Sequence, residues 1–365
     1  MMAQHPLKLL ALTCVPGLGD WNIKQLISYC GSADEVFNVP KRKLESIPGI
    51  GPKTVQAISE HQTFNEAEAI LKEAEAKGMA VLSYLDPQYP QRMKSQMDAP
   101  AILFKKGMGE LNPDRTLAIV GTRKATTYGK QVTQKIVEDL KDMQVQIISG
   151  LAYGIDIEAH RAALKHDTST VAVLAGGLDY IYPSAHKKYA EEMQEHGAII
   201  SESVPGTKPD PHLFPARNRI IAGMADAVIV VEAAEKGGAL ITAKIADSYN
   251  RALFAVPGNL ENTYSAGTNK LIASQLALIY TGVQDLATHL SWDLEESAKE
   301  PVPLPELSGA EEKLYRLLTE KGQPIEIDQI AIQAQLPVNQ VASILLGLEF
   351  KNLVKALPGK KFRTL

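Results

Sequence analysis

The sequence has few cysteines, no long apolar run and no excess of positive charge. Its two cysteines, Cys14 and Cys30, lack CxxC spacing, which excludes a disulfide framework and argues against a zinc site. No apolar stretch approaches the length of a membrane span, and the first residues lack the cleavage pattern of a secretory signal. We therefore expect a soluble, cytoplasmic protein with reduced thiols and no metal.

Two further absences limit the classes of ligand that the sequence supports. The formal net charge is −4, so the total charge gives no argument for nucleic acid, and such a role depends on local arginines and lysines. The first apolar strand of the central region leads into GTRKATTYG rather than G-x-G-x-x-G, and the lysine pattern of a P-loop does not occur. We therefore expect no dinucleotide and no other cofactor.

Residues 1–78 are expected to form a helical domain. They contain two copies of an apolar-Pro-Gly-apolar-Gly motif, at Val15–Gly19 and Ile47–Gly51. The motif resembles the helix-hairpin-helix of SAM-like domains, whose glycine turn presents backbone N–H groups to a nucleic-acid phosphate. Such hairpins also serve as packing units alone, and both roles stay open here.

The middle of the chain alternates short apolar runs with amphipathic helices. This alternation is typical of a parallel sheet covered on both faces, which predicts a Rossmann-like, doubly wound α/β domain over residues 116–290. Residues 79–115 begin with a strand-like run, but their prolines indicate a connecting segment. The expected strands of the domain are 117–120, 145–148, 170–174, 198–201, 227–231 and 252–256.

The C-terminal part resembles a winged helix. Residues 291–307 are acidic and then proline-rich, as in a linker, and Ser308 and Glu311 have the spacing of a helix capping box. Over 308–365, three helical runs precede two short strands around a Pro-Gly turn. Its basic tip suits nucleic acid, whereas other winged helices dock proteins, and both roles stay open. The tip residues are Lys360, Lys361 and Arg363.

The stretch 214–246 predicts a phosphate site. It opens with FPARNR, which holds Arg217 and Arg219, and it ends in a Lys-Gly-Gly loop and a helix entered at Ala239. Two glycines at a strand-to-helix turn let a phosphate approach the backbone and the N–H groups of the helix start. Arginines nearby in sequence can add bidentate contacts.

The ends of the other predicted strands support this site. In an open parallel sheet, ligands bind beyond the carboxyl ends of the strands. Five ends that carry glycine or polar residues predict a preformed floor for an anion, and they add Arg123 as a third basic candidate. These ends are 121–123, 149–150, 176–177, 237–238 and 257–258.

A catalytic triad is the less favoured interpretation of Ser149, Asp156 and His160. The aspartate and the histidine are four residues apart on a predicted helix and can share a face. The segment lacks the nucleophile elbow that a triad serine needs, so a helix-start aspartate and a structural histidine are favoured. His186 and His212 stand in proline-flanked loops without metal-ligand partners.

Seven segments together resemble the DNA-processing protein A family, DprA or Smf. The resemblance implies a non-enzymatic, homodimeric protein that binds single-stranded DNA, protects incoming DNA and loads the recombinase RecA during natural transformation. The segments are IVGTRKATTYG (119–129), SGLAYGIDIEAH (149–160), VLAGGLDYIYPSAH (173–186), ISESVPG (200–206), FPARNRIIAG (214–223), GGALITAKIA (237–246) and AVPGN (255–259).

The same resemblance implies the residues that face DNA. Arginine and lysine neutralise phosphates, and the ring of Phe214 can carry an unstacked base, although a core role for this ring is equally open. Where the family often has Ser-Gly-Ser, this chain has Gly-Gly-Ala at 237–239, which removes two hydroxyls. The implied set is Gly121, Thr122, Arg123, Phe214, Arg217, Asn218, Arg219, Lys236, Gly237, Gly238 and Thr242.

Two alternatives to a DNA-binding protein stay open. The sheet with its glycine-rich loop also resembles nucleotide-binding phosphoribohydrolases, which use a Pro-Gly-Gly-x-Gly-Thr loop and a following glutamate. This chain has KGGALIT over 236–242 and lacks the expected glutamate after it. The other alternative is a pure adaptor whose winged helix docks a protein.

Overall fold

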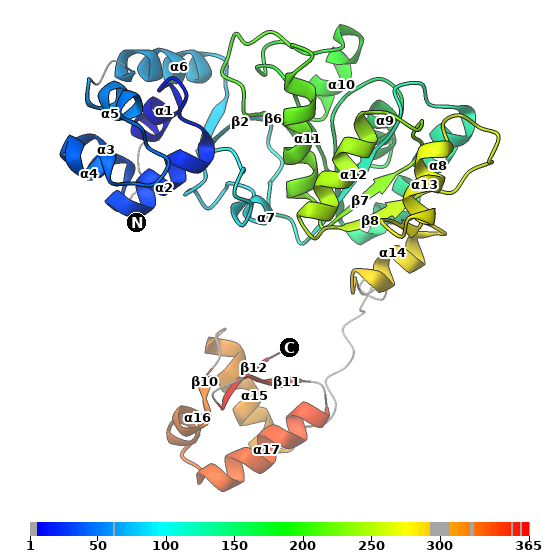
Figure 1. Ribbon diagram of the computed structural model, residues 1–365. Helices are drawn as coiled ribbons and strands as arrows, with labels where there is room; N and C mark the ends of the chain where they lie inside the picture. Colours follow the sequence, from blue (N-terminus) through cyan, green and yellow to red (C-terminus); the bar gives the residue numbers. More distant parts are fainter. Residues whose placement is uncertain are drawn as a thin grey trace. The chain divides into compact units, whose positions relative to one another are not determined.

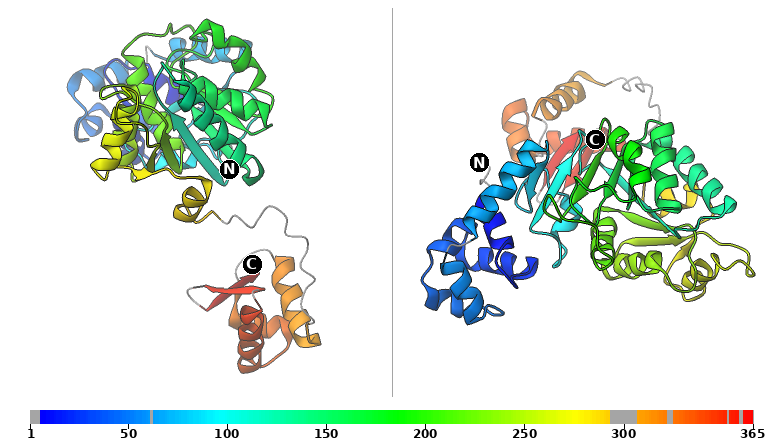
Figure 2. Two further views of the ribbon diagram at one scale, coloured as in Figure 1. Left: turned by 90° about the vertical axis from the view of Figure 1, so that its right-hand side faces the viewer. Right: turned by 90° about the horizontal axis from the view of Figure 1, so that it is seen from above.

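The chain divides into two units, residues 1–297 and 298–365 (Figure 1, Figure 2). Of the expected linker at 291–307, residues 293–306 lie outside the described part. The computed structural model describes residues 6–60, 63–292, 307–321, 325–351, 353–357 and 360–364.

Six helices form the described part of the N-terminal region, residues 6–60 and 63–76. The two glycine motifs make the turns of two helical hairpins, α1–α2 and α4–α5. Gly17 and Gly49 have φ of 76° and 82° in these turns, a conformation that glycine adopts without steric cost. The helices are α1 (Leu7–Thr13), α2 (Asp20–Cys30), α3 (Ala33–Asn38), α4 (Lys41–Glu45), α5 (Pro52–Ser59) and α6 (Phe64–Ala76).

A nine-stranded sheet follows, with the order β1-β2-β6-β5-β4-β3-β7-β8-β9. In this sheet order, each pair of neighbouring strands from β6 through to β9 is parallel. The strand numbers decrease from β6 to β3 and then increase from β7 to β9, so the boundary between β3 and β7 is a topological switch point. The strands are β1 (Ala80–Ser83), β2 (Ile102–Lys106), β3 (Arg115–Val120), β4 (Val145–Ser149), β5 (Thr170–Val173), β6 (Ala198–Ser201), β7 (Ala227–Val230), β8 (Ala252–Ala255) and β9 (Leu278–Ile279). The predicted doubly wound α/β domain is thus confirmed.

Successive residues of a strand pack against helices on opposite faces of the sheet. Leu117 and Ile119 of β3 share an apolar cluster with α8 and α9, whereas Ala118 and Val120 share one with α11 and α12. Helices α11 and α12 lie side by side, α11 over β3, β4 and β5 and α12 over β7 and β8 (Figure 1). The helices of this domain are α7 (Gln91–Lys94), α8 (Thr127–Leu140), α9 (Ile155–Lys165), α10 (Lys187–Glu192), α11 (Leu213–Met224), α12 (Gly238–Ser248), α13 (Ala266–Ala273) and α14 (Val283–His289).

Residues 79–115 are more than the expected connecting segment. They add β1 and β2 to the sheet, and β2 pairs antiparallel with β6, so the sheet starts at Ala80 rather than near residue 116. The prolines lie in the turns between these strands, and Pro100 accepts a 2.7 Å hydrogen bond from the buried Tyr89 hydroxyl. The apolar run of β2 is too short for its periodicity to reveal a strand in the sequence.

The C-terminal unit is a winged helix. It contains α15 (Gly309–Lys321), α16 (Ile327–Ala334) and α17 (Val338–Phe350), with the antiparallel strands β10 (Ile325–Glu326), β12 (Lys361–Thr364) and β11 (Val354–Leu357) in that sheet order. The predicted capping box is present, because Ser308 N donates to Glu311 Oε2 at 2.8 Å and Glu311 N to Ser308 Oγ at 3.4 Å. The two-residue strand β10 gave no signal in the sequence.

Among the described residues, no single helix is long and apolar enough to cross a membrane. Only α16 and α17 taken together reach that length and apolarity, and they are bent by 107°. Their apolar residues build the core of the winged helix, with Ile330, Val341 and Leu345 fully buried.

Candidate nucleic-acid interface

The carboxyl ends of β3 and β7 meet a cavity of about 500 Å³ at the switch point. Three segments supply most of its lining, namely the loop after β3, the first turns of α11, and the loop that enters α12, and Ala152, Asp156 and Tyr182 line it as well. All the expected site residues except Arg219 line this cavity. They are Gly121, Thr122, Arg123, Phe214, Arg217, Asn218, Lys236, Gly237, Gly238 and Thr242.

The N-terminus of α12 opens into the cavity without a side-chain cap. Gly237 precedes the helix in extended backbone, and a Cβ on Gly237 or Gly238 would meet nothing within 4 Å. Asn218 Nδ2 and Thr242 Oγ1 each donate to the Gly238 carbonyl at 3.4 Å. Leu240 N donates to the Gly237 carbonyl at 3.2 Å, whereas the N–H groups of Gly238 and Ala239 donate to no described residue. These two N–H groups can bind an anion, which the helix dipole also favours.

The loop after β3 is held from two sides. Thr122 N donates to the Glu232 carbonyl at 2.7 Å, and the Thr122 carbonyl accepts from Ile155 N at 3.2 Å. Gly154 packs directly on this loop with φ 81°, and a Cβ there would collide with the backbone of Thr122 and Arg123. The loop is therefore preorganised, and it presents the exposed Arg123 at the cavity.

Glu232 is a buried carboxylate that no pattern in the sequence predicts. It follows β7, and its two oxygens accept from Thr126 N at 2.9 Å and from Thr126 Oγ1 at 2.6 Å. These contacts place a negative charge at the start of α8, where the helix dipole stabilises it. Gly129 is required beside it, because a Cβ at this position would collide with the carboxylate. Glu232 thus anchors the start of α8 beside the end of β7.

Arg217 lines the cavity but is only 4% exposed. Its Nη1 donates to the carbonyl of Gly150 at 2.6 Å and to that of Val173, which ties together the ends of β4 and β5. Burial lowers the pKa of Arg217 to about 10, although the neighbouring Asp156 opposes this change. Arg217 is therefore a structural residue as well as a source of positive charge.

The ring of Phe214 lies close to two arginines at the cavity. Its ring centroid lies 5.2 Å from the guanidinium carbon of Arg123 and 5.9 Å from that of Arg217, within the range of cation–π contacts. The ring is half-buried and belongs to none of the apolar clusters formed by the described residues. Of the two roles considered for Phe214, the geometry favours a ligand platform over a core aromatic.

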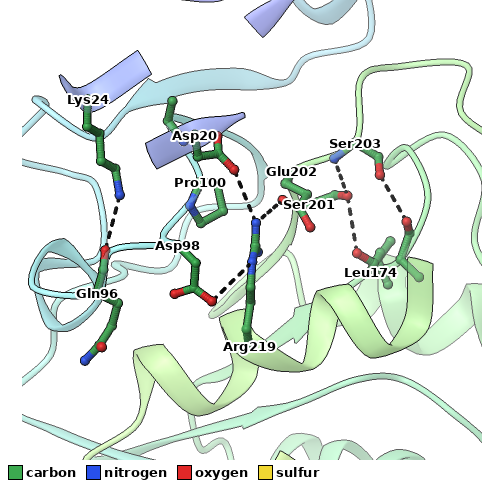
Figure 3. A network of polar contacts seen from close by, with 12 residues as sticks. Asp20, Lys24, Gln96, Asp98, Pro100, Leu174, Ser201, Glu202, Ser203 and Arg219 are labelled. Atoms are coloured by element: carbon green, nitrogen blue, oxygen red, sulfur yellow. Dashed lines mark hydrogen bonds and ion pairs between the residues drawn. The ribbon is translucent and has the colours of Figure 1, made fainter. Parts of the chain in front are cut away.

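Arg219 does not enter the cavity, which corrects the expectation for this residue. Figure 3 shows its guanidinium pointing towards Asp20, Asp98 and Glu202, at 3.4, 3.9 and 2.6 Å. Burial acts to lower the pKa of Arg219, but these carboxylates outweigh it and hold the pKa above its usual value. Because Asp20 begins α2, Arg219 fastens the N-terminal helices to the sheet.

The geometry supports structural roles for Ser149, Asp156 and His160. Ser149 Oγ donates to the Ile119 carbonyl at 2.6 Å, so its proton is not directed at the histidine. His160 is buried with Nδ1 2.7 Å from Thr170 Oγ1, and burial lowers its pKa to about 3. Asp156 lies in the first turn of α9, as expected. No group of three or more acidic, histidine or cysteine side chains in the described part is arranged for a metal.

Comparison with known proteins identifies the family. DNA recombination-mediator protein A matches residues 80–291. The chain belongs to this family. The DprA winged helix domain matches residues 298–360, and a SAM-like helix-hairpin-helix tandem matches 9–61 and 41–87. The predicted DprA/Smf family is therefore confirmed, and membership supports a DNA-processing, recombination-mediator role.

Relatives and solved structures agree with this assignment. DNA processing protein DprA of Bacillus subtilis is 41% identical over 60% of this chain and 74% of its own length. Protein Smf of Synechocystis is 31% identical over 97% of both chains. The crystal structure of DprA from Streptococcus pneumoniae has a TM-score of 0.69 at 33% identity, over 79% of this chain and 98% of its own.

A second solved structure concerns nucleic acid directly. It is described as giving insight into the single-stranded DNA binding mode of DNA processing protein A from Helicobacter pylori. Its TM-score is 0.53 at 31% identity, and the match covers 58% of this chain and 95% of that protein.

Proposed function

We propose that the protein is a non-enzymatic recombination mediator that binds single-stranded DNA in the cavity at the β3–β7 switch point. The observation that carries the proposal is the combination of an uncapped α12 N-terminus, the cations Arg123 and Lys236, and the ring of Phe214 around one cavity. N–H groups and cations bind phosphate oxygens, and an aromatic ring stacks on a base. The description of the Helicobacter pylori relative supports the same ligand.

A single strand fits this cavity better than a duplex. The bases of a duplex are already stacked, so they cannot lie on Phe214 without unpairing. A duplex also binds through a broad positive surface, and the net charge of −4 provides none. The ligand is therefore expected to place one or a few unpaired nucleotides against the cavity.

The test compares two ligands at two salt concentrations. Fluorescence anisotropy with labelled oligothymidine should give tighter binding than with a hairpin stem of matched length. Binding to both should weaken with salt, because phosphate contacts release counterions. Equal affinity for the two ligands would overturn the preference for single strands.

The enzyme alternative makes a different prediction. A phosphoribohydrolase would release free base from purine nucleotides, whereas a binding protein releases none. The carboxylates near the cavity are engaged, since Glu232 is held by Thr126 and Asp156 faces Arg217. We therefore expect no free base after incubation with purine nucleotides. Detection of free base would support the phosphoribohydrolase alternative.

As part of the same proposal, the protein acts as a homodimer that protects incoming DNA and loads RecA during natural transformation. The open edge of the sheet supports dimerisation, because Leu278 and Ile279 of β9 are 44% and 48% exposed there. An exposed apolar edge strand is a template for pairing with a second chain. Light scattering should give a dimer for the wild type and a monomer for Ile279→Lys. RecA filament formation on protein-coated DNA tests the loading role.

A further inference from the structure

Exposed tyrosines continue from the cavity along the carboxyl edge of the sheet. Tyr180 and Tyr182 lie between β5 and the short 3-10 turn Ser184–His186, and they are 40% and 52% exposed. Because β5 is separated from β3 only by β4, this segment borders the cavity on the side away from β7. Neither residue belongs to the set that the sequence implied.

The tyrosines adjoin Phe214. Tyr182 lines the same cavity, and its ring centroid lies 5.9 Å from that of Phe214 with an interplanar angle of 65°. Tyr180, Tyr182 and Phe214 also line one narrow cleft beside the cavity, together with Arg217. Three aromatic side chains therefore lie along one cleft between the arginines and the segment after β5.

Tyr180 and Tyr182 differ from the structural tyrosines in the hydrogen bonding of their hydroxyl groups. Tyr89 donates to Pro100, and Tyr128 donates to the Pro257 carbonyl at 2.8 Å, so each of those rings is fixed by its own hydroxyl. The hydroxyls of Tyr180 and Tyr182 bond to nothing in the part of the chain that the structure describes. Their exposure is therefore not explained by a hydrogen bond within the fold.

We propose that Tyr182, followed by Tyr180, extends the base-stacking surface that begins at Phe214. The strand then leaves the phosphate cavity across the segment after β5, with its bases on the tyrosine rings and its phosphates towards solvent. This inference rests on the proposed single-stranded DNA binding. Because every base has a π face, such a surface binds without sequence preference.

The experiment measures oligothymidine affinity by anisotropy for four variants of the full chain. Tyr182→Ala should weaken binding about 5- to 150-fold, the usual effect of losing one stacked base. Tyr182→Phe should bind within about twofold of the wild type, since it keeps the ring and loses a hydroxyl without a partner. Tyr182→Leu keeps an apolar side chain without a π face and should behave like alanine. Tyr29→Ala removes a tyrosine of α2 that is 54% exposed, and it is the matched control with no expected loss.

Two further measurements identify stacking as the cause. With an oligonucleotide of abasic sites, wild type and Tyr182→Ala should bind equally, since no base remains to stack. Tyr182→Ala should also keep the wild-type dependence of affinity on salt concentration. Arg123→Ala should instead reduce the slope of log affinity against log salt concentration by the equivalent of about one phosphate contact.

The outcomes separate this inference from the proposed function. A wild type that does not bind oligothymidine overturns both. A wild type that binds, with Arg123→Ala weakened and Tyr182→Ala and Tyr182→Leu unchanged, overturns the inference alone. An equal loss in Tyr182→Phe and Tyr182→Ala would indicate a hydroxyl contact and would also overturn it.

Discussion

Arg217 and Arg219 stand two residues apart on α11, and their guanidinium groups serve different parts of the molecule. Arg217 Nη1 lies 2.6 Å from the Gly150 carbonyl at the cavity, whereas Arg219 Nη2 lies 2.6 Å from Glu202 beside the N-terminal helices. Residues two apart on a helix are rotated by about 200° and cannot face the same ligand. One helix therefore links the cavity wall to the contact with α2.

The exposed Arg123 should be a binding residue without a role in stability. Arg123→Ala removes a charge-assisted phosphate contact worth about 1.5–3 kcal/mol, so oligothymidine affinity should fall about 10- to 150-fold. The melting temperature should not change, because the side chain is exposed. The adjacent Lys124 is also exposed and does not line the cavity, so Lys124→Ala is the matched control. Unchanged affinity in a folded Arg123→Ala would mean that phosphates bind elsewhere.

Arg217 should affect stability as well as binding. Arg217→Ala leaves the carbonyls of Gly150 and Val173 without their donor and Asp156 without its buried counter-charge. Leaving a buried acceptor without its donor costs about 1–3 kcal/mol for each carbonyl, which chemical denaturation should detect. Arg217→Lys keeps the charge but loses the planar fork, so we expect an intermediate loss. A normal unfolding curve for the alanine variant would contradict the structural role.

Arg219 should hold the N-terminal helices and leave DNA binding nearly unchanged. Arg219→Gln removes the charge that faces Asp20 and Glu202, and the partly buried Glu202 carboxylate then loses its cation. Hydrogen exchange in α2 should increase, while oligothymidine affinity should stay within about twofold of the wild type. A large loss of oligothymidine affinity with unchanged hydrogen exchange in α2 would indicate that Arg219 binds DNA.

Arg217 and Arg219 show what the sequence alone could and could not predict about the site. In the sequence FPARNR is one basic run, but α11 directs Arg217 and Arg219 to opposite sides. Of the five predicted strand ends, 121–123 and 237–238 line the cavity, whereas 149–150, 176–177 and 257–258 do not. Parallel strands bring their carboxyl ends to one edge of the sheet whatever their order, but this does not determine which of the ends border a given cavity.

Other features depend on contacts distant in sequence. Strand β2 is specified by pairing with β6, which lies about a hundred residues later, and its short apolar run carries no period of its own. Glu232 acts on Thr126 across the switch point, so neither residue reveals the other in sequence. Tyr182 reaches the cavity only because the segment after β5 packs against Phe214.

His160 should make stability depend on pH. The Thr170 hydroxyl donates to the Ile147 carbonyl at 3.0 Å, so the ring donates from Nδ1 and is neutral. Its pKa is lowered from 6.5 to about 3 by burial, so between these values the unfolded chain binds a proton that the folded chain does not. Stability should therefore fall as the pH decreases from about 6.5, by up to about 1.4 kcal/mol per pH unit for one proton.

The His160→Gln variant isolates this effect. Other groups titrate in the same range, so the relevant quantity is the difference between the two proteins in unfolding free energy at each pH. The variant should be less stable at pH 8, and the gap should narrow towards pH 5 because it lacks the proton uptake of the unfolded histidine. A gap that is constant over this range would contradict a depressed pKa for His160.

The winged helix should be dispensable for binding to the cavity. Residues 298–365 form a unit of their own, and every residue that lines the cavity lies between Val120 and Thr242. A chain ending at residue 297 should therefore bind oligothymidine within about tenfold of the full chain, a loss of at most about 1.4 kcal/mol. Some loss is expected if the basic tip touches the same strand, because a tethered second contact raises the effective concentration. Light scattering and a melting curve establish that the truncated chain is folded and has kept its oligomeric state. A much larger loss from such a chain would make the winged helix, rather than the Arg123 cavity, the principal DNA site.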